Sequence, residues 1–300
     1  MPLNQNQFLK YLQKNFSPKH KILISISCGI DSTVLYDLIN KSKFFDLKNT
    51  FYIFFDHQKR VEGKYEIEKF INYYGVNKKN TFIKKLKLGK NETSFQNKAR
   101  AARHQYIIKL SKFLGTDEVF LGHHLDDFKE SYFLRKIQSS NVLGLSNIFN
   151  EKFDKLNIYR PLVTYTKKQI KVYAKKNNLI WFEDRSNFEL DYTRNKIRSY
   201  LISNPKISKS IEKDLKNYQD LEYLVNFYSF YFKRLSKKSF EIKLKEFKCL
   251  NKTLQLIAVQ SLYYSLRLKL KKQPRNENIT NFIEVVLSFN HNSRLKRSVF

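Results

Sequence analysis

One short stretch of the chain combines two hydroxyls, a glycine and a carboxylate at the spacing of a phosphate-binding turn. Ser27 and Ser32 supply hydroxyl donors, and Gly29 allows a tight turn before a helical pattern begins. The free N–H groups and the dipole of such a helix attract an anion. Asp31 suits this position only if a metal ion lies between its carboxylate and the phosphate. An ordinary strand-to-helix turn with an N-cap is the alternative, and no Gly-Lys-Ser/Thr follows to make a Walker A loop.

A second candidate site is an acidic and histidine-rich cluster at residues 123–130. It contains His123, His124 and three carboxylates, in a chain that is otherwise strongly basic. Asp127 and Glu130 are three residues apart and would share one face of a helix. The cluster lacks the His-x-x-x-His spacing of zinc helices. It could therefore hold another metal ion or an ammonium group, and N-capping by Asp126 beside surface acids is the alternative.

Two pairs of arginines are placed to hold phosphate groups. Arg100 and Arg103 lie at i, i+3, and Arg194 and Arg198 lie at i, i+4, so each pair shares a helical face. Neighbouring guanidinium groups repel each other unless an anion lies between them. Aromatic residues at 181–182 precede the second pair, which suits contact with an unpaired base and its phosphates. Solvated basic faces are the alternative interpretation of both pairs.

Alternating strand and helix patterns predict an α/β fold with an open parallel sheet and helices on both faces. Ligands of such sheets bind beyond the carboxyl ends of the strands, where Ser27, Asp56 and His123 are expected. Asp56-His57 is a weak candidate by itself. The predicted strands are residues 22–27, 51–55, 81–83 and 118–122, and the predicted helices are residues 7–15, 30–40, 61–74, 95–114, 126–137, 165–178 and 194–200.

The pattern changes after Pro205, which we expect to close the first region. We predict a catalytic domain at residues 1–206 and a small, mainly helical domain at residues 207–300. The helical patterns of the second domain cover residues 211–232, 250–270 and 279–287, and lysine-rich breaks at 233–238 and 271–275 separate them.

Composition favours a nucleic-acid partner. The formal net charge is +30, and the chain contains 26 Phe and 19 Tyr. An AT-rich genome would give the same bias, so the charge permits RNA or DNA binding without proving it. No apolar run approaches the roughly 18 residues of a membrane span, and residues 1–6 do not resemble a signal peptide. Two cysteines are too few for a disulfide framework, which favours a reducing, cytoplasmic setting.

Taken together, the motifs resemble the tRNA(Ile)-lysidine synthetases, a branch of the PP-loop ATP pyrophosphatases, over about residues 20–205. Cys28 stands where this family has its first glycine, and Gln138–Asn141 replaces an Arg-Gly-Ser-Gly segment. The resemblance is to the short members, since longer members continue past the position of Phe300. The matching stretches are Ser27–Ser32, Asp56-His57, Ala99–Arg103, His123–Asp127 with Glu130, Gly144-Leu145, Arg160–Leu162, Glu183-Asp184 with Ser186-Asn187, and Arg194-Asn195 with Arg198.

The resemblance implies ATP and Mg²⁺ as cofactors, and free L-lysine and the CAU-anticodon isoleucine tRNA as substrates. It implies adenylation of the oxygen on carbon 2 of the wobble cytidine, followed by displacement of AMP by the lysine ε-amine. The implied ATP-binding residues are Ser27, Cys28, Gly29, Ile30, Asp31 and Ser32, with Asp31 as the metal contact; the implied catalytic residues are Asp31, Arg100, Arg103 and Asp127; the implied lysine-binding residues are Asp126, Asp127 and Glu130; and the implied tRNA-binding residues are Asn187, Arg194, Asn195 and Arg198.

Two other functions stay open at the level of sequence. A PP-loop tRNA thiolase would need a pair of reactive cysteines or a cysteine-bound cluster, and Cys28 and Cys249 are far apart in the chain. A basic RNA-binding protein without catalysis is the other alternative, because of the changes at Cys28 and residues 138–141. The sequence does not fix the oligomeric state, and a homodimer is compatible with it.

Overall fold

The computed structural model describes residues 2–56, 62–86, 95–137, 156–182, 193–219, 230–235, 240–266 and 276–289. These described residues fall into two compact units. One unit comprises those within 1–130 and 151–199, and the other those within 131–150 and 200–300. The predicted domain boundary after residue 206 remains a prediction.

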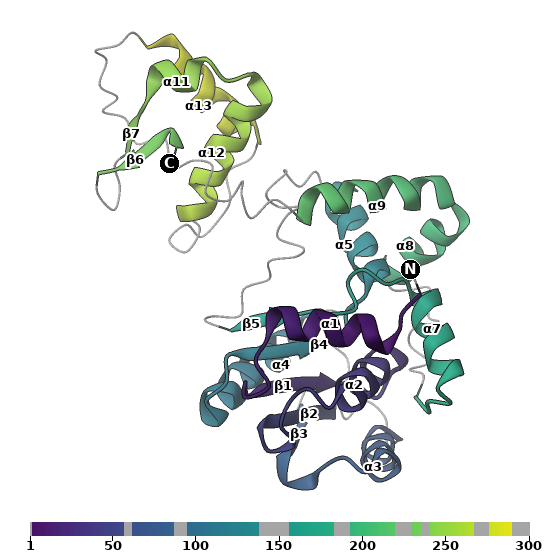
Figure 1. Ribbon diagram of the computed structural model, residues 1–300. Coiled ribbons are helices and arrows are strands. Elements are labelled where there is room, and N and C mark those ends of the chain that lie inside the picture. The colour runs from purple at the N-terminus through teal and green to yellow at the C-terminus, as the bar shows by residue number, and fades with distance from the viewer. Residues whose placement is uncertain are drawn as a thin grey trace. The chain divides into compact units, whose positions relative to one another are not determined.

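The first unit is built on a five-stranded parallel sheet with the order β3-β2-β1-β4-β5 (Figure 1). Its alternating β-branched and aromatic residues suit buried strands. The chain moves outward from β1 through β2 to β3 and then returns to place β4 on the other side of β1. This reversal between β1 and β4 is the switch point at which such sheets bind ligands. The strands are β1 (Ile22–Ile26), β2 (Thr50–Asp56), β3 (Thr81–Lys85), β4 (Glu118–Leu121) and β5 (Asn157–Tyr159).

Helices cover both faces of this sheet, because successive side chains of a strand point to opposite sides. Ile22, Ile24 and Ile26 of β1 join a core with α1, α2, α3 and α7. Leu23 of β1 joins the opposite core, which includes Ile107 of α4. The helices of this unit are α1 (Gln5–Asn15), α2 (Ile30–Ser42), α3 (Glu62–Tyr74), α4 (Phe95–Leu114), the start of α5 (Leu125–Ile137), α7 (Lys167–Lys176) and most of α8 (Thr193–Ser203), with short 3₁₀ turns η1 (Leu47–Asn49) and η2 (Lys78–Asn80).

The second unit is mostly helical in its described part. The core of its C-terminal part contains Phe247, Val259, Leu262 and Ile283. Its further elements are α9 (Pro205–Gln219), β6 (Phe232–Arg234), β7 (Phe240–Ile242), α11 (Leu244–Lys248), α12 (Lys252–Leu266) and α13 (Asn276–Ser288), and β6 pairs with β7 in an antiparallel ladder.

The predicted fold class is confirmed, and several local predictions were wrong. Pro205 begins α9 rather than closing the region, because a proline needs no N–H partner at the first helical position. The break predicted at residues 233–238 begins inside β6. The helix predicted at residues 211–232 was extended too far, because residue 232 is the first residue of β6. The strand β5 was missed, since three residues carry almost no periodic signal. None of the described helices has the length and apolar character needed to cross a bilayer.

Candidate functional site

The turn between β1 and α2 leaves the first backbone N–H groups of the helix without a side-chain cap. Gly29 is the N-cap of α2, and no side chain caps this helix end. The first N–H groups of a helix have no acceptor within the helix, and the dipole adds positive potential there. Ser27 is exposed beside them. The start of α2 and the Ser27 hydroxyl beside it are therefore the residues to which the predicted phosphate cradle corresponds, and phosphate binding there remains a prediction.

Two buried hydroxyls fix the shape of this turn. Ser32 Oγ accepts a hydrogen bond from Ser27 N at 3.1 Å and donates to the carbonyl of Gly29 at 3.0 Å. Thr33 Oγ1 donates to the same carbonyl at 2.9 Å. The Ser32 hydroxyl therefore donates its proton to the backbone of the turn, and in this structure it stabilises the shape of the turn. Thr33 was not singled out from the sequence, although a hydroxyl four residues after a turn glycine is a readable signal.

Cys28 adopts the left-handed conformation that glycine favours, with φ 61°. The strain anticipated for a cysteine in place of the family's glycine is therefore present. Its carbonyl accepts a hydrogen bond from Phe182 N at 3.0 Å, which ties the turn to the segment after α7. The side chain is buried, and burial raises the pKa of the Cys28 thiol to about 12. The thiol is thus protonated at neutral pH and is a poor nucleophile.

Asp31, in the first turn of α2, is paired with a lysine that sequence reasoning missed. Lys167 Nζ lies 2.7 Å from both carboxylate oxygens of Asp31. Lys167 is the first residue of α7, where Thr166 and Gln169 form a capping box. The Thr-x-x-Gln spacing is visible in the sequence and marks a helix start. This spacing could have predicted that Lys167 begins a helix. It could not have predicted that this helix starts beside Asp31.

The junction between β4 and α5 places its own side chains over the start of the helix. Asp127 Oδ2 accepts a hydrogen bond from His124 N at 3.0 Å, and His124 Nδ1 accepts one from Asp126 N at 3.2 Å. His124 Nδ1 is therefore an acceptor here, which leaves Nε2 as the donor nitrogen of the ring. This atom lies 3.6 Å from Asp31 Oδ1 and 3.6 Å from Asp127 Oδ2. The two predicted clusters thus meet at His124, which was part of a motif but had been given no role.

Asp127 is fully ionised at neutral pH. Burial alone would raise its pKa, but the imidazole groups of His124 and His123, the N–H of His124 and the ammonium of Lys167 together hold the pKa below its ordinary value. Asp126, by contrast, anchors another helix, because its Oδ2 accepts a hydrogen bond from Lys167 N at 2.7 Å. Its Oδ1 lies 3.6 Å from the buried Lys129 ammonium.

The structure also joins two residues that the sequence had assigned to different substrates. Glu130 Oε1 accepts a hydrogen bond from Arg198 Nε at 2.6 Å, and Glu130 Oε2 accepts one from Arg198 Nη2 at 3.2 Å. Glu130 is 3% exposed. Burial raises the pKa of Glu130 although Arg198 opposes this shift, so the charged form depends on the pair.

Gly122 is where the two junctions touch. A Cβ built there would lie 3.0 Å from Ser32 N and 3.1 Å from the carbonyl carbon of Asp31. Both contacts are with backbone atoms, which cannot rotate away as the end of a side chain can. The glycine therefore allows the end of β4 to approach the phosphate cradle, and no sequence pattern identified this need.

Arg100 and Arg103 lie in the first half of α4. This helix follows β3, so its first half belongs at the carboxyl edge of the parallel sheet. Burial and the charge of Arg100 both lower the pKa of Arg103. Two close guanidinium groups, one of them withdrawn from water, make an environment that an anion would stabilise.

The carboxylate of Asp31 is chemically suited to Mg²⁺. In this structure the Lys167 ammonium binds both of its oxygens, so the site already accommodates a cation. Mg²⁺ is commonly held by one or two carboxylates together with substrate phosphates rather than by a full protein cage. No cluster of three or more His, Cys, Asp or Glu residues with metal-binding geometry occurs in the described part of the chain. The donor set therefore fits Mg²⁺ bound together with a phosphate.

Several predicted residues are only partly placed. The side chain of Arg194, the whole of Asn187 and His57 lie outside what the structure describes. Asn195 is in the first turn of α8 and is partly buried, and Asp56 is buried at the end of β2. Trp181 and Phe182 pack against the main core of the first unit. These two aromatic rings therefore support the fold rather than standing free for a base.

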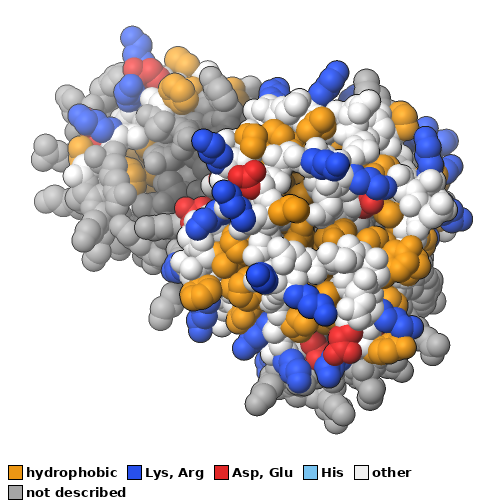
Figure 2. Space-filling view, turned by 60° about the horizontal axis from the view of Figure 1, so that its bottom comes forward, with side chains coloured by type: hydrophobic (Ala, Val, Ile, Leu, Met, Phe, Trp, Pro, Cys, Tyr) orange, Lys and Arg blue, Asp and Glu red, His pale blue; other side chains and the backbone are white. Residues whose placement is uncertain are grey.

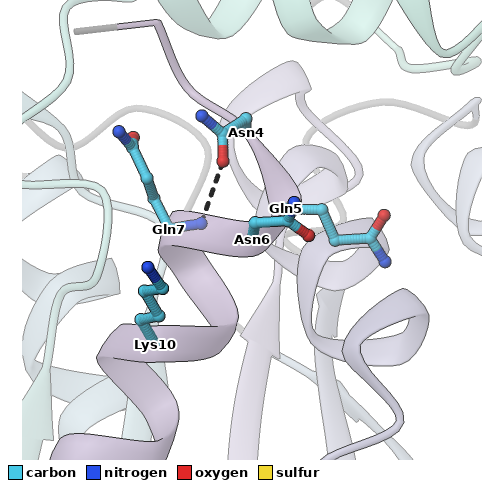
Figure 3. A pocket seen from close by; sticks show the side chains of 5 residues that line it. All are labelled: Asn4, Gln5, Asn6, Gln7 and Lys10. Atoms are coloured by element: carbon cyan, nitrogen blue, oxygen red, sulfur yellow. Dashed lines mark hydrogen bonds between the residues drawn. The ribbon is translucent and has the colours of Figure 1, made fainter.

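A shallow hollow at the start of α1 contains none of the predicted site residues (Figure 3). The Oδ1 atom of Asn4 accepts a hydrogen bond from Gln7 N at 2.9 Å, so this side chain caps the helix. Its lining is Asn4, Gln5, Asn6, Gln7 and Lys10. This hollow is a capped helix end and carries no chemistry of its own.

Comparison with known proteins gives consistent matches. The model of a PP-loop domain family matches residues 2–204. A protein of Gracilaria tenuistipitata var. liui named tRNA(Ile)-lysidine synthase, chloroplastic, is 30% identical over 236 residues, which cover 74% of this chain and 71% of that protein. A tRNA(Ile)-lysidine synthase of Pseudothermotoga lettingae is 31% identical over 231 residues, which cover 72% of this chain and 49% of that protein.

The matched part of this chain covers about half the length of several of its curated relatives. Among solved structures, it resembles a U34-tRNA thiolase from Methanococcus maripaludis that was solved with its [4Fe-4S] cluster. The TM-score is 0.57 at 17% sequence identity, and the match covers 72% of this chain and 78% of the other. This likeness concerns the fold.

Proposed function

The chain belongs to the PP-loop family and, within it, to the tRNA(Ile)-lysidine synthases, and from this premise we propose that it attaches free lysine to carbon 2 of the wobble cytidine in the CAU-anticodon isoleucine tRNA. The observation that carries this proposal is the meeting of an uncapped helix start and an ionised acidic cluster at His124. One element attracts phosphate and the other attracts an ammonium group. A reaction between ATP, a tRNA base and lysine needs both.

In the first step, the oxygen on carbon 2 of the cytosine attacks the α-phosphorus of ATP, and pyrophosphate leaves. The N–H groups at the start of α2 and the Ser27 hydroxyl would hold the leaving pyrophosphate. Arg100 and Arg103 would stabilise the charge on the α-phosphoryl group. Mg²⁺ held between Asp31 and the phosphates would neutralise phosphate charge. Lys167 is placed to change its partner from Asp31 to a phosphate when ATP arrives.

In the second step, the ε-amine of lysine attacks carbon 2, the bond from carbon 2 to the adenylated oxygen breaks, and AMP leaves. Asp127 would attract the lysine ammonium, because its lowered pKa keeps it charged. A carboxylate with such a pKa is a weak base. Glu130, whose pKa is raised, is better suited to take the proton that the amine must lose. This assignment requires Arg198 to release Glu130 in part.

Asp126 would support the lysine site indirectly. Its carboxylate holds the start of α7 and thereby positions Lys167 beside Asp31. Asn187, Arg194, Asn195 and Arg198 remain proposed tRNA contacts, as does the second unit. Homodimer formation is likewise a proposal.

The decisive experiment measures AMP release from labelled ATP by the purified protein, with the tRNA transcript and L-lysine added separately and together. We expect repeated turnover only when both are present, and lysidine in the digested tRNA by mass spectrometry. Turnover that requires a sulfur donor instead of lysine would identify a thiolase, and absence of AMP in every mixture would identify a binding protein. Either result would refute the proposal.

The thiolase alternative has little support from the cysteines. Cys28 is buried with a raised pKa, and Cys249 is exposed in the second unit. A variant with both cysteines changed to serine should keep its lysine-dependent activity.

A further inference from the structure

Helix α7 has an unusual charge composition. Five of its ten residues are lysines, and the helix contains no Asp or Glu. Lys167 points its ammonium into the site, as described above. Lys168, Lys171 and Lys175 are exposed and lie at i, i+3 and i+7, so they form one row along the helix. We call these three residues the α7 lysine row.

The helix that carries this row packs against the core of the first unit. Its opposite face buries Ile170, Tyr173 and Ala174 in the main core of the first unit. Tyr173 Oη donates a hydrogen bond to Asp37 Oδ2 of α2 at 2.8 Å. The capping box at Thr166 and Gln169 fixes the start of the helix. The three lysines of the row are therefore carried by a helix that is fixed to the core by packing, by a hydrogen bond and by its cap.

The row is unfavourable for the isolated helix. Like charges at i, i+3 or i, i+4 destabilise a helix. Lys167 and Lys168 also occupy the first turn, where the helix dipole disfavours cations. Asp31 compensates Lys167, but within α7 no acidic side chain compensates the exposed row. An external polyanion lying along the helix would remove this repulsion.

The direction of the row relates it to the site. α7 begins at Lys167 beside Asp31 and runs away from this contact, so the row starts next to the site. A span of seven residues is about 10 Å of helix. A nucleic-acid strand in a duplex presents a charge about every 3.4 Å of axis, so several phosphates fit this length. Figure 2 shows Lys and Arg side chains gathered at the right-hand edge, on the side where Figure 1 draws α7.

We infer that the α7 lysine row binds the phosphate backbone of the RNA substrate as the strand leaves the catalytic site. This inference rests on the proposed function, since it takes the RNA from that proposal. It adds a surface that none of the predicted tRNA contacts includes. The lysines act as point charges, so they contribute affinity and orientation, whereas recognition of the base stays with the site.

The test changes the three lysines of the row together, as K168Q/K171Q/K175Q. Glutamine has nearly the helix propensity of lysine, so the helix should persist. The matched control is K48Q/K78Q/K79Q, which removes the same charge from exposed lysines in the turns before β2 and β3, at the amino edge of the sheet. The dissociation constant for the tRNA transcript is measured between 50 and 200 mM salt for each protein.

We expect the row variant to bind the tRNA at least about tenfold more weakly at the lowest salt, with a salt slope smaller by about 2 because each phosphate contact contributes roughly 0.7–0.9. The control should keep the slope of the unchanged protein, and ATP affinity should be the same in all three. An unchanged slope in the row variant, or an equal fall in both variants, would overturn the inference.

Catalysis is measured in parallel to separate the two proposals. An unchanged protein that makes lysidine while the row variant keeps the full salt slope would refute the row and leave the function standing. A slope that depends on the row in a protein that makes no lysidine would refute the function and leave the RNA surface standing. Absence of any tRNA binding by the unchanged protein would refute both.

Discussion

The junctions β1–α2 and β4–α5 lie on either side of the sheet's switch point and share a strand–turn–helix course, yet they differ in what covers the helix start. At β1–α2 the N-cap is Gly29, and no side chain caps the first N–H groups of the helix. At β4–α5 the side chains of Asp127 and His124 bond to the turn's own backbone. An open helix start attracts an anion, whereas one occupied by its own carboxylates attracts a cation. Under the proposed function, the same backbone course would serve phosphate on one side and an amine on the other.

Asp31 is the exception within the open junction, because it adds a negative charge where phosphate should bind. Lys167 compensates it, and His124 Nε2 stands between Asp31 and Asp127 at 3.6 Å from each. The two junctions therefore form one electrostatic unit. Three substitutions test this comparison, and we order them by the size of the expected effect. They change Asp31, Gly122 and Cys28.

The largest effect should come from Asp31→Ala. The change leaves the cradle backbone in place but removes the carboxylate that holds a cation beside the phosphates. We expect the tRNA-dependent exchange of pyrophosphate into ATP to fall by about 10²–10³-fold, as when a group that stabilises transition-state charge is lost. Asp46→Ala is the control, since Asp46 is exposed at the amino edge of the sheet and its side chain caps nothing. Exchange that persists in Asp31→Ala would show that the open junction needs no carboxylate.

A smaller effect is expected from Gly122→Ala. The new methyl group would press on the backbone of Ser32 and Asp31, and overpacking of this kind costs about 1–3 kcal/mol of unfolding free energy. Because the cradle itself must shift, we expect pyrophosphate exchange to fall by about tenfold to a hundredfold.

The control for this change is Gly63→Ala in α3, where the new Cβ would meet Asp56 Oδ1 at an ordinary 3.7 Å. That variant should keep its activity, and its unfolding temperature should stay the same or rise. Equal behaviour of the two variants would mean that the junctions do not depend on their close approach.

The sequence predicted what the repeating patterns encode. The parallel sheet, the main helices and the two junctions followed from apolar periodicity and from turn residues, and the helix at residues 95–114 was placed to the residue. The short strands β5, β6 and β7 were missed, because three residues complete no period. Their pairing depends on neighbours that are far away in the chain.

The site was predicted less completely, for a related reason. Motifs name residues that are close in sequence, so Asp31 and Asp127 were singled out as candidates, whereas Lys167 reaches Asp31 across 136 residues. Glu130 and Arg198 were found separately, but their pairing is a property of packing. The need for glycine at residue 122 is likewise visible only when β4 and α2 are placed side by side.

The smallest effect should come from Cys28→Gly, which tests whether the open junction depends on its side chain or only on its backbone. A non-glycine residue in the left-handed region costs about 1–2 kcal/mol, and this strain would be relieved. Loss of a buried side chain and the greater freedom of glycine in the unfolded chain oppose the gain. We therefore expect the unfolding free energy to change by less than about 1 kcal/mol, and lysine-dependent AMP formation to stay within about threefold.

Cys28→Val provides the contrast, since a β-branched residue is strongly disfavoured at φ 61° and should weaken both stability and exchange. Complete loss of activity in the glycine variant, with stability intact, would show that the thiol takes part in the chemistry.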